Sequence, residues 1–283
     1  MEISDPRSMV KLALLESIRI LRSSKCLILL ICGVFININV IDPIRELSHQ
    51  MGEKVSFLEP FAALSNSGFV LLFIPLLYLV MMSDFPDNTS FRYFYCSRMS
   101  KKRWVVNQVF CIYISALLYL MTVILFTVIL SADFISFRVD FSDAVRYYAV
   151  TFPERSFSYV ALLFPLNMLN QMTLMEVVNY SLFALYMYLI LLVQITLFFS
   201  IIQKKIIGIV LDFIIVFVGM VLSSIDTGFQ WVFPLSHTVS WWHFREVAAK
   251  PIFPLEYSII YLLTINVAMT VMIMLNSKKA RPE

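Results

Sequence analysis

The sequence predicts an all-α, polytopic membrane protein with six transmembrane helices, and three observations support this class. Hydrophobic residues make up 60% of the 283 residues and charged residues only 14%, whereas soluble proteins are about half apolar and about a quarter charged. The charges gather between six long apolar runs, and an apolar run of about 20 residues crosses a bilayer as a helix. Five runs carry no charge, and the other carries only the carboxylate of Asp212. The predicted spans are 26–41, 61–82, 104–132, 177–203, 206–225 and 257–277.

The distribution of charge predicts the topology, because Lys and Arg are retained on the cytoplasmic side of a membrane. With both termini in the cytoplasm, fifteen of the 22 Lys and Arg fall in inner segments and only seven in outer ones. Those seven are Arg45, Lys54, Arg138, Arg146, Arg155, Arg245 and Lys250. No cysteine lies in an outer segment, and the amino terminus does not read as a cleavable signal peptide. We therefore expect residues 1–283 to form one transmembrane domain in a plasma membrane.

The chain begins with an amphipathic stretch, which we predict to be a helix over residues 9–24. Its apolar residues recur every three or four positions and share one face, whereas basic residues lie on another. The apolar set is Val10, Ala13, Leu14, Ile18 and Leu21, and the basic set is Lys11, Arg19 and Arg22. Such a helix can lie in the headgroup layer before the first span. It is either a structural elbow or a basic flank that only sets the topology.

Polar residues mark the first two spans. The first contains Asn37 and Asn39 and is expected to end at Asp42-Pro43, and the second opens with the stretch Ser65-Asn66-Ser67-Gly68. Side-chain amides inside a span favour contact with other helices, and small residues allow helices to approach closely. A proline at position 75 of the second span should bend the helix by freeing a backbone carbonyl.

The largest inner loop, residues 83–103, predicts a short cytoplasmic helix over 87–98. Asp87 or Asn88 is a suitable N-cap, and aromatic residues then alternate with Arg92 and Arg98. This helix is either a docking surface for a partner or an interfacial helix that only connects two spans.

Two outer segments, 133–176 and 226–256, are rich in aromatic residues. We expect the first to pack on the membrane surface. The second also contains several prolines and three of the four tryptophans, and tryptophan favours the membrane interface. Part of it could re-enter the outer leaflet, provided that protein covers its irregular backbone.

The chain shows no motif of catalysis, of nucleotide binding or of nucleic-acid recognition, and we expect it not to be an enzyme. His49, His237 and His243 all fall in outer loops, where hydrogen bonding at the interface is expected in preference to a metal site. Asp212 is a functional candidate because a charge inside a span is costly. The alternative is a structural role, with the carboxylate paired to Lys204 or Lys205.

The order of these elements, together with a few stretches of sequence, carries a family resemblance. The stretches are 91–108 (FRYFYCSRMSKKRWVVNQ), 172–208 (which includes TLMEVVNYS and ends QKKIIG), 233–243 (FPLSHTVSWWH) and 254–275. In them the chain resembles the membrane subunit of ABC-2-type ABC transporters of Gram-positive bacteria.

The resemblance implies a role for each element. Residues 9–24 would be the connecting helix, and 87–98 the coupling helix that docks on a separate ATPase subunit, with contacts from Asp87, Phe91, Arg92, Tyr95 and Arg98. Residues 226–256 would hold the re-entrant element. A second permease subunit, the same or different, would complete a translocation path lined by Asn37, Asn39, Ser65, Asn66, Ser67 and Asp212. ATP and Mg²⁺ would bind the ATPase, and this chain itself would carry no cofactor.

The function that follows is export of an amphipathic substrate, such as a peptide, an antibiotic or a lipid-like molecule, across a bacterial plasma membrane. Two alternatives stay open. A non-transporting receptor or immunity protein would bind a peptide through its outer segments. A secondary carrier would need a coupled ion site, for which the spans offer only Asp212.

Overall fold

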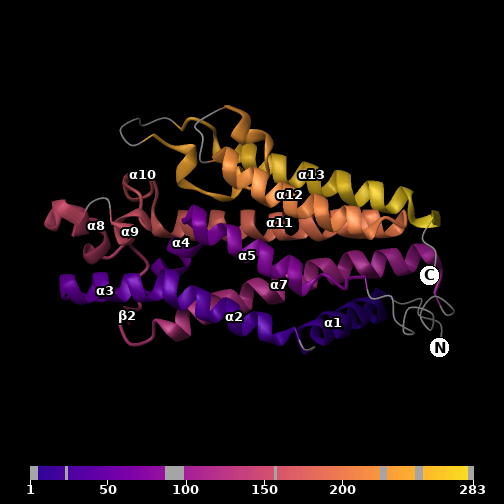
Figure 1. Ribbon diagram of the computed structural model, residues 1–283, viewed down its shortest axis with the longest axis horizontal. Coiled ribbons are helices and arrows are strands. Elements are labelled where there is room, and N and C mark those ends of the chain that lie inside the picture. Colours follow the sequence, from indigo (N-terminus) through magenta and orange to yellow (C-terminus); the bar gives the residue numbers. More distant parts are fainter. Residues whose placement is uncertain are drawn as a thin grey trace.

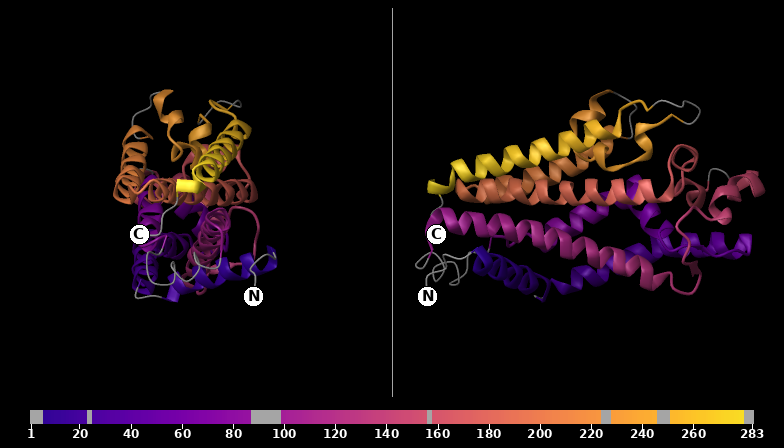
Figure 2. Two further views of the ribbon diagram at one scale, coloured as in Figure 1. Left: turned by 90° about the vertical axis from the view of Figure 1, so that its right-hand side faces the viewer. Right: turned by 180° about the vertical axis from the view of Figure 1, so that it is seen from behind.

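The computed structural model describes residues 6–22, 25–86, 99–155, 158–223, 228–245 and 251–279. It is an elongated bundle of helices that run along its length (Figures 1 and 2). One end, which we call the terminal end, holds α1 (Pro6–Arg22) and the carboxyl end of α13 (Leu255–Leu275). The opposite end, the loop end, holds α3 (Asp42–Met51), α8 (Asp143–Thr151) and α9 (Tyr159–Leu162).

Within the described residues, five helices are long and apolar enough to cross a membrane, and a sixth span is possible as a bent pair. The five are Leu27–Met51, Lys101–Leu130 (α7), Leu174–Ile201 (α11), Lys205–Leu222 within α12 (Lys205–Ser223), and α13. The bent pair is Glu59–Asn66 and Val70–Met81, whose axes differ by 83°. The chain is therefore a multi-pass, all-α membrane protein. Which end faces the cytoplasm stays a prediction, although the connections predicted to be inner and outer do separate to opposite ends (Figure 1).

The second predicted span, 61–82, differs most from its expected form, because it is not one helix. It consists of α4 (Glu59–Asn66) and α5 (Gly68–Met81), and the sharp change of direction lies at Ser67 and not at Pro75, which sits inside α5. Ser67 has an extended backbone (φ −81°, ψ 115°), which no α-helix can contain.

The first span also differs from its prediction, because it does not end at Pro43. α2 (Cys26–Ile36) passes through a π-helical turn, η1 (Asn37–Ile41), directly into α3. Pro43 is the second residue of the α3 segment and directly follows the π-helical turn. α3 ends at Gly52, whose φ of +66° suits glycine.

The remaining loop-end elements come from the two aromatic outer segments and from the strand before α4. Strand β1 (Val55–Ser56) pairs in parallel with β2 (Ile135–Ser136), with Val55 opposite Ile135. The other elements are η2 (Pro153–Arg155), α10 (Leu166–Gln171), η3 (Gly228–Val232), η4 (Ser236–Thr238) and η5 (Trp241–His243). A short turn at the terminal end, η6 (Ser277–Lys279), follows α13.

Helix α11 forms the centre of the bundle, with α12 and α13 on one side and α5 and α7 on the other (Figure 1). Of the residues in its most apolar stretch, 67% are buried, whereas the share is 22% in α12 and in α13. α11 begins with a capping box in which Thr173 and Glu176 satisfy each other's backbone N–H groups. The core is therefore built around one enclosed helix, and its outer neighbours keep broad apolar faces for lipid.

α1 packs along the terminal half of α7 and not only against lipid. Ala13 and Ser17 are buried there, and the Glu16 carboxylate accepts hydrogen bonds from Asn107 and Gln108 of α7 (3.0 and 3.2 Å). Val10, Leu14 and Leu15 are exposed. α1 covers Pro6–Arg22, and whether it is the amphipathic connecting helix predicted over 9–24 stays a prediction. The predicted coupling helix, 87–98, lies outside the described residues.

Candidate functional site: the broken second span

The short helix α4 is enclosed by protein along its whole length, since all eight of its residues are buried. Pro60 stands in its first turn, where a missing N–H is harmless, and the carboxyl group of Glu59 lies at the positive end of the helix dipole. Irregular backbone at membrane depth is tolerated only where protein or a water-filled cavity surrounds it. The break at Ser67 therefore depends on the elements that cover α4.

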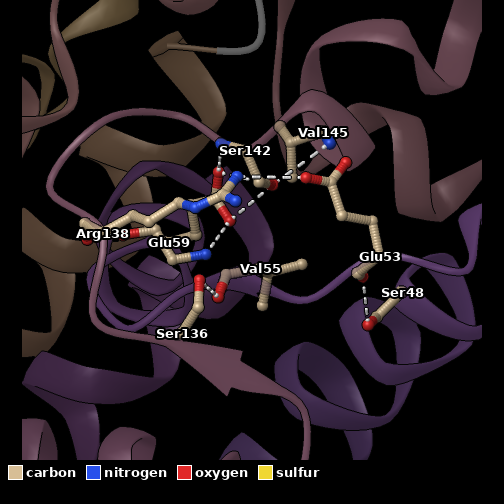
Figure 3. Close-up of polar contacts among 9 residues, drawn as sticks. Ser48, Glu53, Val55, Glu59, Ser136, Arg138, Ser142 and Val145 are labelled. Carbon is tan, nitrogen blue, oxygen red and sulfur yellow. Dashed lines mark hydrogen bonds and ion pairs between the residues drawn. The ribbon is translucent and has the colours of Figure 1, made fainter.

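Glu59 fixes the first end of α4, as Figure 3 shows. Its side chain is fully buried. Its Oε2 accepts a hydrogen bond from the Ser56 N–H (2.7 Å), and its Oε1 accepts one from the Ser142 N–H (2.6 Å). The Ser142 hydroxyl lies 3.0 Å from both carboxylate oxygens. Because Ser142 is also the N-cap of α8, one carboxylate joins α4, strand β1 and α8.

A more exposed set of contacts surrounds Glu59 and holds the same elements together (Figure 3). Arg138 forms an ion pair with Glu53 (3.1 Å), and their side chains are 61% and 32% exposed. The Ser136 hydroxyl donates to the Val55 carbonyl (3.1 Å), across the strand pair. The Ser48 hydroxyl donates to the Glu53 carbonyl (2.7 Å) and so ties α3 to this cluster.

Asn66 fixes the other end of α4 to different elements. Its Oδ1 accepts hydrogen bonds from the N–H and the hydroxyl of Ser240 (2.9 and 2.7 Å). Its Nδ2 donates to the Ser181 hydroxyl of α11 (3.0 Å) and to the Ala62 carbonyl of its own helix (3.0 Å). The Trp241 indole N–H donates to the Asn66 carbonyl (2.9 Å). The two ends of α4 are thus held by two different loop-end segments.

The predicted path residues divide into those around the break and one that lies elsewhere. The Ser65 hydroxyl bonds back to the Phe61 carbonyl, the Asn39 amide donates to the Phe35 carbonyl, and the Asn37 amide donates to Asp42 (2.8, 3.0 and 3.0 Å). Ser67 is the break itself. That these side chains line a path stays a prediction, since several of them bond within their own helix.

Asp212 is the predicted path residue that is not part of this site. It is fully buried between α11 and α12, and its Oδ2 accepts a hydrogen bond from the Thr196 hydroxyl (2.5 Å). Its Oδ1 has no hydrogen-bond partner within the described part of the chain. The bonded partner that the structure gives it is therefore a threonine of α11, where the sequence suggested Lys204 or Lys205.

Two buried histidines, His237 and His243, hold the segment 226–256, which contacts the end of α4 through Ser240 and Trp241. The Nε2 of His237 lies 2.8 Å from the Trp231 carbonyl, which can only accept, so Nε2 carries the proton and Nδ1 accepts from the Ser258 hydroxyl (2.7 Å). The Tyr180 hydroxyl donates to the His237 carbonyl (2.7 Å) and accepts from His243 Nε2 (2.7 Å). Hydrogen bonding thus assigns each ring one neutral tautomer.

Burial supports the same protonation state for both rings. Burial lowers the pKa of His237 to about 4 and that of His243 to about 3. Trp231 stacks on His243 and on Phe253 with ring centres 4.8 and 4.5 Å apart, and Tyr261 stacks on His237 at 4.2 Å. The expected hydrogen-bonding role of these histidines is therefore what the structure describes, with both rings buried.

Among the residues of this site that sequence reasoning missed are Glu59, Ser142 and Tyr180. Glu59 stands two positions before the predicted span, and its partner Ser142 is 83 residues away. Ser142 does carry a recognisable signal, because a serine before Asp143 is typical of a helix N-cap. The partners of Tyr180 are 57 and 63 residues away, and no local pattern indicates them.

At the terminal end, Lys25 connects the elbow between α1 and α2 to the end of α5. Its ammonium donates to the Ser83 hydroxyl (2.8 Å) and the Met81 carbonyl (3.3 Å), and it pairs with Asp84 (2.9 Å). This hydrogen bond holds the pKa of Asp84 below its usual value. The predicted coupling residues, Asp87, Phe91, Arg92, Tyr95 and Arg98, follow directly and lie outside the described residues.

The described residues contain no group of three His, Cys, Asp or Glu side chains that could hold a metal ion. What the site offers is a set of fixed hydrogen bonds, which link a broken span to two loop-end segments. Comparison of the chain with protein-family models, with curated proteins and with solved structures finds no match.

Proposed function

We propose that this chain is the membrane subunit of an ABC-2-type transporter that exports an amphipathic substrate across a bacterial plasma membrane. The observation that best supports transport is the broken second span, with a fully buried half-helix bound at both ends to loop-end segments. Broken helices are a recurrent means by which transporters build a substrate path inside the bilayer. The choice of the ABC-2 family rests on the resemblance in sequence and in the order of elements.

The proposed mechanism is alternating access between two packings of the spans. ATP binding would close separate ATPase subunits against each other, and the segment 87–98 would carry their movement to the spans. Lys25 would help to transmit it, because it ties the end of α5, from which that segment continues, to the elbow before α2. A ligand can shift such an equilibrium only by the difference in its affinity for the two states. This chain would undergo the conformational change, and the partner would bind and hydrolyse ATP.

The test is whether an ATPase accompanies the chain and whether its attachment needs the aromatic, arginine-bearing loop. We would purify the tagged chain from its native membrane in mild detergent and measure vanadate-sensitive ATP hydrolysis in the eluate. We expect hydrolysis with the wild-type chain and its loss with the double substitution Arg92→Glu and Arg98→Glu. Arg146→Glu, at an exposed position on α8 at the loop end, is the matched control and should retain hydrolysis. Hydrolysis that is absent from the wild type, or unaffected by R92E/R98E, would refute the proposal.

A secondary carrier is a second candidate, favoured by the buried carboxylate of Asp212 with one unbonded oxygen. Such a group could take up and release a proton or a cation during transport. The variant Asp212→Asn keeps an acceptor for Thr196 and removes the ionisable group. If the protein is a carrier, this variant should lose the pH dependence of transport in reconstituted vesicles. If it is an ATP-driven exporter, the variant and the wild type should show the same pH dependence.

A further inference from the structure

The π-helical turn in the first span lies beside a backbone carbonyl whose usual hydrogen-bond donor is missing. In a regular α-helix, the carbonyl of Asn39 would accept a hydrogen bond from the N–H of residue 43. Residue 43 is proline and has no N–H. The turn η1 widens the helix here, and the N–H of Asp42 donates to the carbonyl of Asn37, five residues earlier. Single π-helical turns of this kind occur frequently at functional sites.

The group that satisfies the Asn39 carbonyl comes from the outer segment 133–176. The hydroxyl of Tyr159, the first residue of α9, donates to it at 2.9 Å. Tyr159 therefore ties α9 to the point where the first span departs from a regular helix. Its side chain is 41% exposed, so it is not a buried core residue.

We propose that Tyr159 is a positioning residue which fastens the π-helical turn at Asn39 to α9, and which releases it when the spans open at the loop end. The inference rests on the proposed transport function, since it names the residue through which segment 133–176 acts on the path. The reason is geometric: one hydroxyl of segment 133–176 bonds a backbone carbonyl at the point where the first span departs from a regular helix. An opening movement that separates the first span from this segment must break the bond.

The test removes only the hydroxyl, with Tyr159→Phe, and reads amide hydrogen exchange in residues 37–48 of the chain in nanodiscs. A net hydrogen bond of ordinary strength predicts exchange about three- to tenfold faster. Tyr147→Phe is the matched control, because Tyr147 lies in the same outer segment and is 54% exposed, and it should leave exchange within twofold of wild type. If exchange in Y159F also stayed within twofold of wild type, the proposed role of the Tyr159 hydroxyl would be refuted.

Pro43→Ala provides a rescue that a general packing role could not give. Alanine supplies the N–H that the Asn39 carbonyl lacks, so the hydroxyl should become dispensable. We expect the double variant Y159F/P43A to exchange at the rate of P43A alone. A double variant that stays as fast as Y159F would show that the hydroxyl does not act through the Asn39 carbonyl, and the inference would fall.

ATP hydrolysis by the complex purified from native membranes separates this inference from the proposed function. If Tyr159 positions the path, Y159F should change the hydrolysis rate at least threefold, and P43A should restore it. Faster exchange with unchanged hydrolysis would make the hydroxyl a structural contact only and would overturn the positioning role, while the transporter proposal stood. If no preparation hydrolyses ATP, the transporter proposal fails and the claim about the path falls with it. The exchange data then test only whether the Tyr159 hydroxyl holds the π-helical turn.

Discussion

Glu59 and Asp212 are both carboxylates with no exposed surface, and the protein treats them in opposite ways. Glu59 accepts from two backbone N–H groups and from the Ser142 hydroxyl, so both of its oxygens are bonded. Asp212 accepts from the Thr196 hydroxyl alone, and its Oδ1 has no partner in the part of the chain that the structure describes. Buried polar atoms are nearly always bonded. Glu59 is therefore part of what specifies the fold, whereas packing gives no reason for Asp212.

The difference follows from where each residue stands along its helix. Glu59 begins α4, and the first N–H groups of a helix and of nearby loops are free to meet a carboxylate. Asp212 lies in the interior of α12, seven residues from its start, where the N–H groups are already used by the helix. Only a side chain of a neighbouring helix can reach it there. The loop end thus fixes its carboxylate with backbone, and the α11–α12 hairpin cannot.

The largest effect expected from this comparison is that of Glu59→Ala. It would leave the N–H groups of Ser56 and Ser142 buried without an acceptor, at a cost of about 3–5 kcal/mol in the free energy of unfolding. Thermal unfolding in detergent measures this change. Glu53→Ala is the matched control: it removes the exposed pair with Arg138, which is worth about 1 kcal/mol or less. Equal losses in the two variants would mean that α4 is not held through Glu59.

The α11–α12 hairpin should instead be sensitive to volume. A Cβ added at Gly208 would lie 2.8 Å from the Cβ of Phe199 and 3.1 Å from the Cα of Thr196, so the two helices would have to separate. We expect Gly208→Ala to cost about 2–3 kcal/mol by overpacking, again in thermal unfolding. Gly33→Ala is the control, since its Cβ would meet Phe126 at an ordinary 3.6 Å. A harmless G208A would show that close approach does not hold this hairpin.

The segment that covers α4 should loosen in acid because of its two histidines. The pKa values of His237 and His243, about 4 and about 3, lie below the usual 6.5. Between pH 6.5 and about 3 the unfolded segment therefore binds more protons than the folded one, and its stability falls as the pH falls. At pH 5.5, one unit below the usual pKa, the loss is about 1.4 kcal/mol per histidine.

Tryptophan fluorescence can follow this acid transition, because three of the four tryptophans lie in the segment 226–256. We expect a shift of emission towards the red as the pH falls below 6.5, and a flatter profile when both buried histidines are replaced by phenylalanine. Replacing the exposed His49 should leave the profile as it is. A profile that is flat in the wild type down to pH 4 would contradict the assignment of neutral, buried rings to this segment.

The long spans of this molecule could be predicted from the sequence almost to the residue. The run 177–203 is α11, Leu174–Ile201, and the run 257–277 is α13, Leu255–Leu275. Length and the absence of charge are enough here, because an uncharged run of about 20 residues crosses a bilayer as a helix, which satisfies its own backbone groups. The class of the protein follows from the same property, and it needs no knowledge of which helices touch.

The irregular points of the spans could not be predicted in the same way. The sequence showed the polar stretch that opens the second span, but whether it breaks the helix depends on what covers it. The partners of Asn66 are Ser181 and Ser240, which lie 115 and 174 residues further along the chain. Likewise Pro43 ends no helix, because the turn before it widens and Tyr159 bonds the freed carbonyl. These outcomes depend on partners distant in the sequence, which periodicity does not reveal.

The smallest effect is expected at Asp212, and it is the sharpest test of the comparison. Asp212→Leu removes a carboxylate with one bonded oxygen and places an apolar side chain in an apolar helix, a change that is often neutral or stabilising. We expect the free energy of unfolding to change by less than about 1 kcal/mol, and Thr196→Val in the same chain to add little, because it removes the hydroxyl left without an acceptor. A loss as large as that of E59A would mean that Asp212 is a structural group after all. A stable D212L chain that no longer supports transport would identify Asp212 as a residue kept for function, at a position where the fold does not require it.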